Sequence, residues 1–132
     1  MNKACIILFS LALIISVAAV TLSCASHNKP IETEADFTGF ITDVQPDRNK
    51  DVIGRIFVES HADKIVTKYV ITIKDDTLLF QQDGENFRNT TFNALKNKQW
   101  VKIWFSGPVM ESFPMQATAQ QVIVVDYDTL VE

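Results

Sequence analysis

Few side chains in this sequence have the type and spacing that bond-making chemistry requires. His61 is the only histidine in the expected folded part, and no cysteine or second histidine lies near it to form a metal site or catalytic pair. Glu111 directly precedes Ser112 and sets a carboxylate beside a hydroxyl. A serine nucleophile needs a positioned base and an orienting group, which this pair alone does not supply. The sequence therefore favours a non-enzymatic protein without a cofactor, and an envelope-associated enzyme is the alternative.

Three aspartates recur every four residues in one polar stretch. They are Asp43, Asp47 and Asp51. A calcium loop would place its carboxylates at alternate positions, with a glycine at the sixth. This stretch has neither feature, so we expect a solvated loop and no metal site.

The N-terminus has the pattern of an export signal. Lys3 is followed by an uncharged stretch over 4–25, and Ile6–Val20 within it is apolar. A short basic region, an apolar region and small residues before a cleavage site are typical of a signal peptide. We expect residues 1–23 to form this signal, as an apolar helix.

Ser23-Cys24 resembles the bacterial lipobox, in which a small residue precedes the cysteine that is modified. The resemblance implies that the Cys24 thiol receives a diacylglycerol, that the chain is cut before it, and that the new amino group is acylated, for example by palmitate. Thr21 stands where the lipobox usually has leucine. We expect a lipoprotein on the exported side of the cell membrane or outer membrane, since several acyl chains anchor stably. Simple secretion and an uncleaved spanning helix are the alternatives.

The charge of the exported part limits its partners. Without Lys3, the 12 basic residues become 11 against 16 acidic ones, a net charge of −5. An acidic domain does not attract nucleic acid electrostatically. Cys5 lies in the signal, so Cys24 has no partner for a disulfide, and core packing must hold the domain together. We expect the membrane as a partner through the anchor, a protein or glycan as a further partner, and no nucleic acid.

The clearest strand in the sequence is Gln99–Gly107. Side chains alternate along a strand, so one face carries aliphatic residues with Phe105 and the other carries Trp-Lys-Trp. We expect Val101, Ile103 and Phe105 to face the core. Trp100, Lys102 and Trp104 would then lie outside, either as a stacking platform or, as we favour, packed under a neighbouring segment.

The order of the expected elements indicates a small β-barrel. Strands are predicted over 36–44, 52–59, 66–74, 99–107 and 121–126, and a helix over Asn89–Lys98 turns Phe92 and Leu95 inward. Five strands with one short helix between the third and fourth favour an OB-fold-like barrel, with a small β-sandwich as the alternative. The predicted organisation is a signal peptide over 1–23, a lipidated cysteine and polar tether over 24–34, and the barrel domain over 35–132.

Three blocks of the sequence resemble the YobA-like family of small exported bacterial lipoproteins. They are Thr38–Ile41, Val101–Gly107 and Glu111–Ala117, and the resemblance extends over roughly residues 36–126. Lys98 departs from the glycine that the family pattern has between helix and strand. The resemblance implies export as a lipoprotein. Because the family is classed as a domain of unknown function, the resemblance implies no particular ligand.

The candidate binding surface combines the outer face of the central strand with the third block. We expect these side chains to meet near one rim of the barrel: Trp100, Lys102, Trp104, Glu111, Ser112 and Gln116. In the alternative interpretation residues 112–117 form a corner wedge, with Phe113 in the core and Gln116 bonded to strand-edge amides. An exposed apolar patch would favour a protein partner, and a concave aromatic groove would favour a glycan or small ligand.

Overall fold

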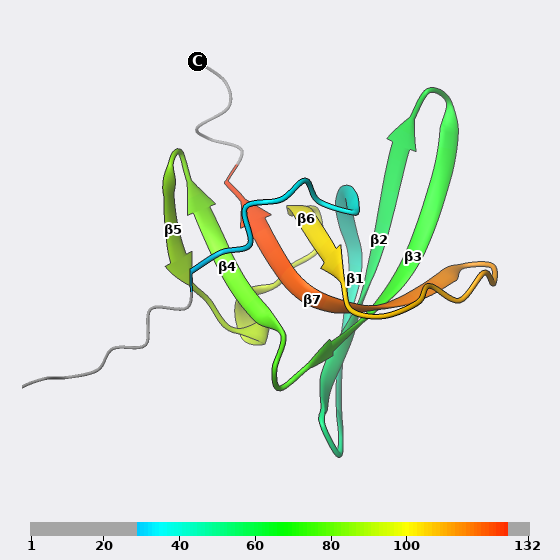
Figure 1. The fold of residues 1–132 in the computed structure, drawn as a ribbon. Coiled ribbons are helices and arrows are strands. Elements are labelled where there is room, and N and C mark those ends of the chain that lie inside the picture. Colours follow the sequence, from blue (N-terminus) through cyan, green and yellow to red (C-terminus); the bar gives the residue numbers. More distant parts are fainter. Residues whose placement is uncertain (1–28, 127–132) are drawn as a thin grey trace, which may run out of the picture.

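The computed structural model describes residues 29–126 (Figure 1). The signal peptide over 1–23 and the lipidated Cys24 lie outside these residues and stay predictions. The described part contains seven strands and one 3-10 helix, which are β1 (Phe37–Asn49), β2 (Val52–Ala62), β3 (Ile65–Lys74), β4 (Leu78–Asp83), β5 (Asn86–Asn89), η2 (Phe92–Ala94), β6 (Trp100–Phe105) and β7 (Met115–Val125).

Five of the strands close into a barrel. The sheet order is β3-β2-β1-β6-β7-β4-β5, and β3 also pairs with β7. The β3–β7 pairing is parallel, whereas β1–β2, β2–β3, β1–β6 and β6–β7 are antiparallel. Closure leaves the barrel strands without open edges over the paired length. The prediction of a mainly-β, five-stranded barrel is therefore confirmed.

Strands β4 and β5 extend the sheet beyond the barrel, which the sequence analysis did not predict. The long strand β7 makes this possible because it changes neighbour along its length. Its first part, Met115–Thr118, pairs with β3, and its second part, Gln121–Val125, pairs with β4. Every residue of β5 is exposed, so no apolar alternation marked this strand in the sequence.

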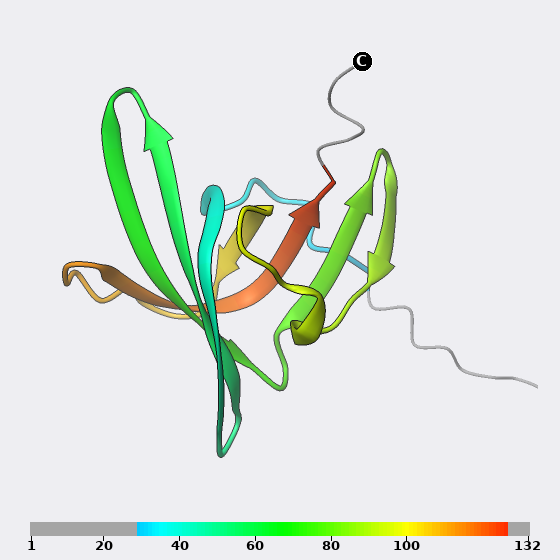
Figure 2. The ribbon, with the colours of Figure 1, turned by 180° about the vertical axis from the view of Figure 1, so that it is seen from behind.

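The helix predicted over Asn89–Lys98 is wrong. Only the three residues of η2 are helical, on the connection from β5 to β6 (Figure 2), and Leu95 is already extended with φ −74° and ψ 127°. Phe92 and Leu95 are nonetheless buried in the barrel core, as predicted. A short helix gains little stability by itself. Contacts with the barrel therefore determine the backbone conformation of this connection. These contacts require only that Phe92 and Leu95 point inward, which a longer helix is not needed to achieve.

The core face of the central strand agrees with its alternation. Val101 and Ile103 are fully buried, among Ile41, Ile56 and Ile71 from the other barrel strands. Phe105 also packs against this core, as predicted, but it is only half-buried. The pairing of β6 with β7 shifts register between residues 104 and 105, and this irregularity moves Phe105 toward the end of the barrel.

Candidate functional site

Trp104 lies under the segment that precedes β1, in a small apolar cluster outside the barrel core. Its indole Nε1 donates to the backbone oxygen of Thr33 at 3.1 Å and to Thr33 Oγ1 at 3.2 Å. Ile31 and Ala35 pack against the same cluster, and Trp104 is only 7% exposed. The interpretation that a neighbouring segment covers this side chain is confirmed, and Trp104 is not an open stacking platform.

The covering segment, residues 29–36, is here called the N-terminal strap. Gln121 is fully buried, and its Oε1 accepts a hydrogen bond from Ile31 N at 2.7 Å while its Nε2 donates to Ile31 O at 3.3 Å. Phe105 N donates to Asp36 Oδ2 at 2.8 Å. The described end of the expected tether is thus attached to the outside of β6 and β7.

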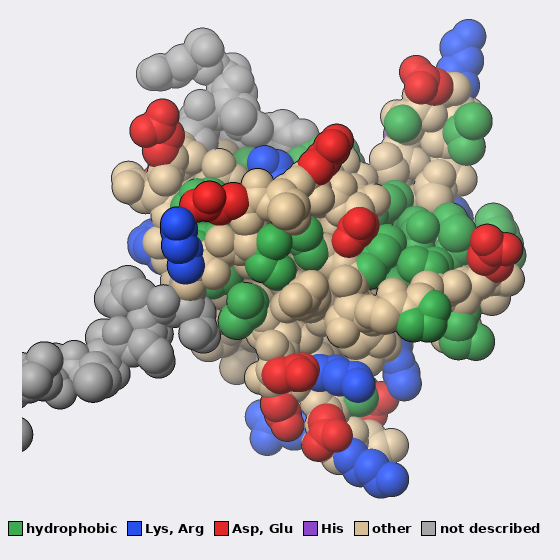
Figure 3. Space-filling view, in the orientation of Figure 1, with side chains coloured by type: hydrophobic (Ala, Val, Ile, Leu, Met, Phe, Trp, Pro, Cys, Tyr) green, Lys and Arg blue, Asp and Glu red, His purple; other side chains and the backbone are tan. Residues whose placement is uncertain are grey.

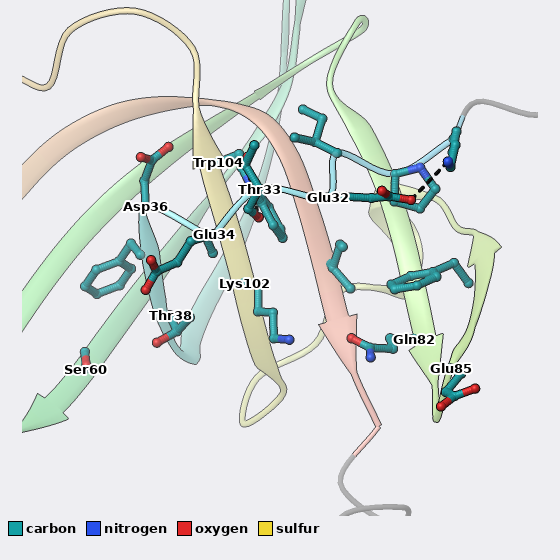
Figure 4. Close-up of a pocket in the computed structure, with 17 residues that line it drawn as sticks. Glu32, Thr33, Glu34, Asp36, Thr38, Ser60, Gln82, Glu85, Lys102 and Trp104 are labelled. Atoms are coloured by element: carbon teal, nitrogen blue, oxygen red, sulfur yellow. Dashed lines mark hydrogen bonds and ion pairs between the residues drawn. The ribbon is translucent and has the colours of Figure 1, made fainter.

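A groove of about 870 Å³ lies beside the strap. Lys102 projects from β6 into it, and in the view of Figure 4 it lies between Glu34 and Thr38 on one side and Gln82 and Glu85 on the other. Apolar side chains of β6 and β7 also line the groove, as do Phe37 at the start of β1 and Phe87 on β5. This is a concave site with both polar and aromatic walls.

Trp100 belongs to neither the strap nor the groove lining. It packs edge-on against Phe40, with ring centroids 4.7 Å apart and an interplanar angle of 73°. In the sheet it pairs with Val125, at the end of β7. Gln116 stands near the other end of that strand. The length of β7 therefore separates Trp100 from the third block.

Glu111 and Ser112 lie on the exposed connection from β6 to β7, and Gln116 follows at the start of β7. Ser112 Oγ donates to Pro114 O at 2.7 Å, and Gln116 Nε2 donates to Ser112 Oγ at 3.4 Å. Backbone bonds between Met110 and Gln116 close the hairpin in both directions, at 2.8 and 3.1 Å. The six predicted residues are consequently distributed over two regions. Lys102 and Trp104 line the groove, and Trp100 packs against the same apolar cluster as Trp104, whereas Glu111, Ser112 and Gln116 lie at this hairpin.

The corner-wedge interpretation of residues 112–117 is wrong. Phe113 is 89% exposed and does not fill the core. The Gln116 side chain bonds to the hydroxyl of Ser112 and not to strand-edge amides. The block forms a tight turn through its own hydrogen bonds, and that turn holds the phenylalanine in solvent.

Phe113 is part of a larger apolar surface. Met110 is 62% exposed on the same connection, and Ile65 is 67% and Val66 45% exposed at the tip of the projecting β2–β3 hairpin. Figure 3 shows hydrophobic side chains gathered between this hairpin and the β6–β7 connection. We call the patch beside the β6–β7 connection the apolar end and define it by Tyr69, Phe105, Met110 and Phe113.

Aromatic rings form the inner part of the apolar end. The Tyr69 ring lies between those of Phe37 and Phe105, with centroid distances of 4.4 and 5.3 Å. Desolvation by burial raises the pKa of Tyr69, which keeps its phenol neutral. Sequence reasoning missed this surface, because it expected Phe105 and Phe113 in the core.

The remaining candidates lie at exposed positions. The His61 side chain is 63% exposed in β2, with Nε2 3.5 Å from Glu59, which also pairs with Lys68 at 3.3 Å. Within residues 29–126 no group of three histidine, cysteine or acidic side chains could hold a metal ion. No helix in that same range is long and apolar enough to cross a membrane.

The comparisons with known proteins identify a family. No curated protein matches the chain, and no solved structure matches it. One family model, described as "Protein of unknown function (DUF3221)", matches residues 39–126. The match starts within β1 and ends directly after β7, so it spans the whole barrel and its two extra strands. Because it covers more than half of the chain, this chain belongs to the DUF3221 family, whose function is unknown.

Proposed function

We propose that this chain is an exported, lipid-anchored accessory module that acts by contacting another protein and not by catalysis. The observation that carries the proposal is the apolar end, where Phe113 and Met110 are exposed together on one connection. Single exposed apolar residues are normal on a surface, whereas grouped ones mark interaction sites. Aromatic residues and methionine are also enriched at protein interfaces.

The strand order supports an OB-like barrel. The barrel closes in the order β1-β2-β3-β7-β6, with β3 and β7 parallel and every other pairing antiparallel. The inward Phe92 and Leu95 take the place of the helix that such barrels often carry between the third and fourth strands. OB-like barrels bind many kinds of ligand, so this likeness by itself names no partner.

The position of the strap favours a partner away from the attachment point. Cys24 precedes Lys29 by five residues, which extend to about 17 Å at most. Lys29 lies on the β4–β5 side of the molecule, and the apolar end lies on the opposite side (Figure 1). A lipid on Cys24 would hold the first side near the membrane surface and leave the apolar end free for a protein.

Substitution of one side chain in the apolar end tests this proposal. In membranes solubilised with mild detergent, we expect the wild-type lipoprotein to migrate in a complex larger than its monomer. Phe113→Ser should shift it to the monomer position, since a buried aromatic anchor contributes about 2 kcal/mol or more to an interface. Phe113 is exposed, so the free protein should keep its unfolding midpoint.

Phe87→Ser is the matched control, because Phe87 is 43% exposed but lies on β5, outside the apolar end. It should leave the complex intact. Docking through the apolar end would be refuted if wild type and Phe113→Ser migrated equally. It would also be refuted if Phe113→Ser and Phe87→Ser lost the complex to the same extent.

A further inference from the structure

We propose that the groove beside the N-terminal strap binds a neutral or amino-sugar oligosaccharide. This site adjoins the apolar end at Phe37, whose ring packs on Tyr69, but the inference does not depend on the protein partner proposed above. Its volume of about 870 Å³ falls within the range of small-molecule sites, roughly 300–1,000 Å³. The strap, β1, β6, β7 and the β4–β5 hairpin all contribute to its walls.

The groove contains polar groups that the protein itself leaves unengaged. Among the described residues, the side chains of Lys102, Glu34 and Glu85 make no hydrogen bond or ion pair. Lys102 is nevertheless half-buried on β6. Donors and carboxylate acceptors that face one space from different elements suit a ligand carrying several hydroxyl groups.

Apolar side chains give the groove a second feature of a saccharide site. Trp104 and Ile123 line it and are 7% and 3% exposed, and Phe37 and Phe87 add their rings. A sugar ring has an apolar C–H face as well as hydroxyl groups at its edge. The combination of apolar lining and a few placed polar groups is what a binding pocket needs for affinity and orientation.

The charge of the groove decides which saccharides it would accept. Four carboxylates line it against two lysines, and Lys29 is already paired with Glu32 at 3.0 Å. The remaining excess of negative charge repels uronic acids and phosphorylated sugars. Neutral N-acetylated sugars and protonated amino sugars meet no such repulsion.

Titration of the purified full-length mature protein in detergent micelles tests the inference. Three tetrasaccharides serve as probes: chitotetraose, its fully deacetylated form and tetragalacturonate. Tryptophan emission reports binding because Trp104 lines the groove, and calorimetry gives the dissociation constant. We expect both glucosamine-based probes to bind and tetragalacturonate not to bind.

Two substitutions in the groove and two outside it locate the site. Lys102→Met and Glu34→Gln should each weaken chitotetraose binding at least tenfold. The matched controls Lys96→Met and Glu111→Gln, at exposed positions outside the groove lining, should change it less than twofold. Glu34 is exposed on the strap, so its substitution keeps the test valid if Lys102→Met alters folding.

Three results would overturn the inference. One is no binding of either glucosamine-based probe up to about 10 mM, ten times the dissociation constant of a weak site near 1 mM. Another is a preference for tetragalacturonate. The third is equal binding by the groove variants and their controls. None of them bears on docking at the apolar end, because the purified protein is titrated without a partner.

Discussion

Lys98 occupies a backbone conformation that suits glycine. Its φ is 75°, in the left-handed region, and its N–H donates to Ile41 O at 2.7 Å. A residue with a Cβ pays roughly 1–2 kcal/mol in this region. The pattern that the sequence resembles has glycine here, and the structure supplies a physical reason. The tight turn from η2 into β6 requires a positive φ.

Lys98→Gly should therefore stabilise the protein. The expected gain in the free energy of unfolding is about 1 kcal/mol, because the removed strain exceeds the extra chain entropy of glycine in the unfolded state. Urea denaturation with an unchanged slope measures it. Lys96→Gly, at an exposed position in the same connection, is the control and should bring no gain. If Lys98→Gly lowered the free energy of unfolding as much as Lys96→Gly does, the account of strain would be refuted.

At the scale of elements, one of the long-range contacts that hold the strap could not be expected from any local sequence pattern. Gln121 and Ile31 are 90 residues apart, and the buried amide satisfies both backbone groups of Ile31. A buried amide that bonds to one backbone segment fixes that segment more specifically than apolar packing would.

Gln121→Met should loosen the strap without unfolding the barrel. Methionine leaves the N–H and C=O of Ile31 without partners, so we expect the free energy of unfolding to fall by about 1–3 kcal/mol. Hydrogen exchange should quicken at Ile31 N–H and at Trp104 Nε1–H, whose acceptor is also in the strap. Gln116→Met, an exposed position on the same strand, should change neither quantity. Unchanged exchange at Ile31 would mean that the strap is held by other contacts.

The strands were predictable where burial follows a period of two. Val101 and Ile103 alternate with polar or aromatic neighbours, and the barrel buries that face. The backbone between β5 and β6 was not predictable, and a helix was wrongly expected there. Two apolar side chains three residues apart fit a helix and a bent connection equally well. Strand β5 was missed because all of its residues are exposed.

The candidate site was predictable only in part, for a related reason. Alternation placed Lys102 and Trp104 on one outer face, and the structure brings both to the groove. It could not reveal that Gln116 stands near the start of β7 while Trp100 pairs with its last residue. Spatial convergence depends on strand length and register, which composition does not encode.

At the scale of the whole molecule, the two candidate surfaces are neighbours that meet at Phe37. The groove adjoins the strap, and the apolar end lies opposite the point where the strap begins (Figure 1). An anchored barrel of this kind could hold a saccharide close to the membrane while its far end contacts a protein.

The anchor itself makes a prediction about the intact chain. Wild-type protein should fractionate with membranes, and its intact mass should correspond to a chain that begins at Cys24 and carries acyl groups. Cys24→Ala should lack the lipid mass, since the thiol that follows the lipobox serine is gone. Cys5→Ala, within the predicted signal, is the control and should leave both properties unchanged. Lipid anchoring would be contradicted if the wild-type mass showed that residues 1–23 were still attached and that no acyl group was present.

The central claim is that the apolar end contacts a protein while the anchor holds the opposite side at the membrane. The most direct test replaces Phe113, and separately Phe87, with a photo-crosslinking phenylalanine derivative in intact membranes. The account predicts a discrete protein adduct from position 113 and none of that size from position 87, both exposed before crosslinking. Lipid adducts alone from position 113, or the same protein adduct from both positions, would contradict it.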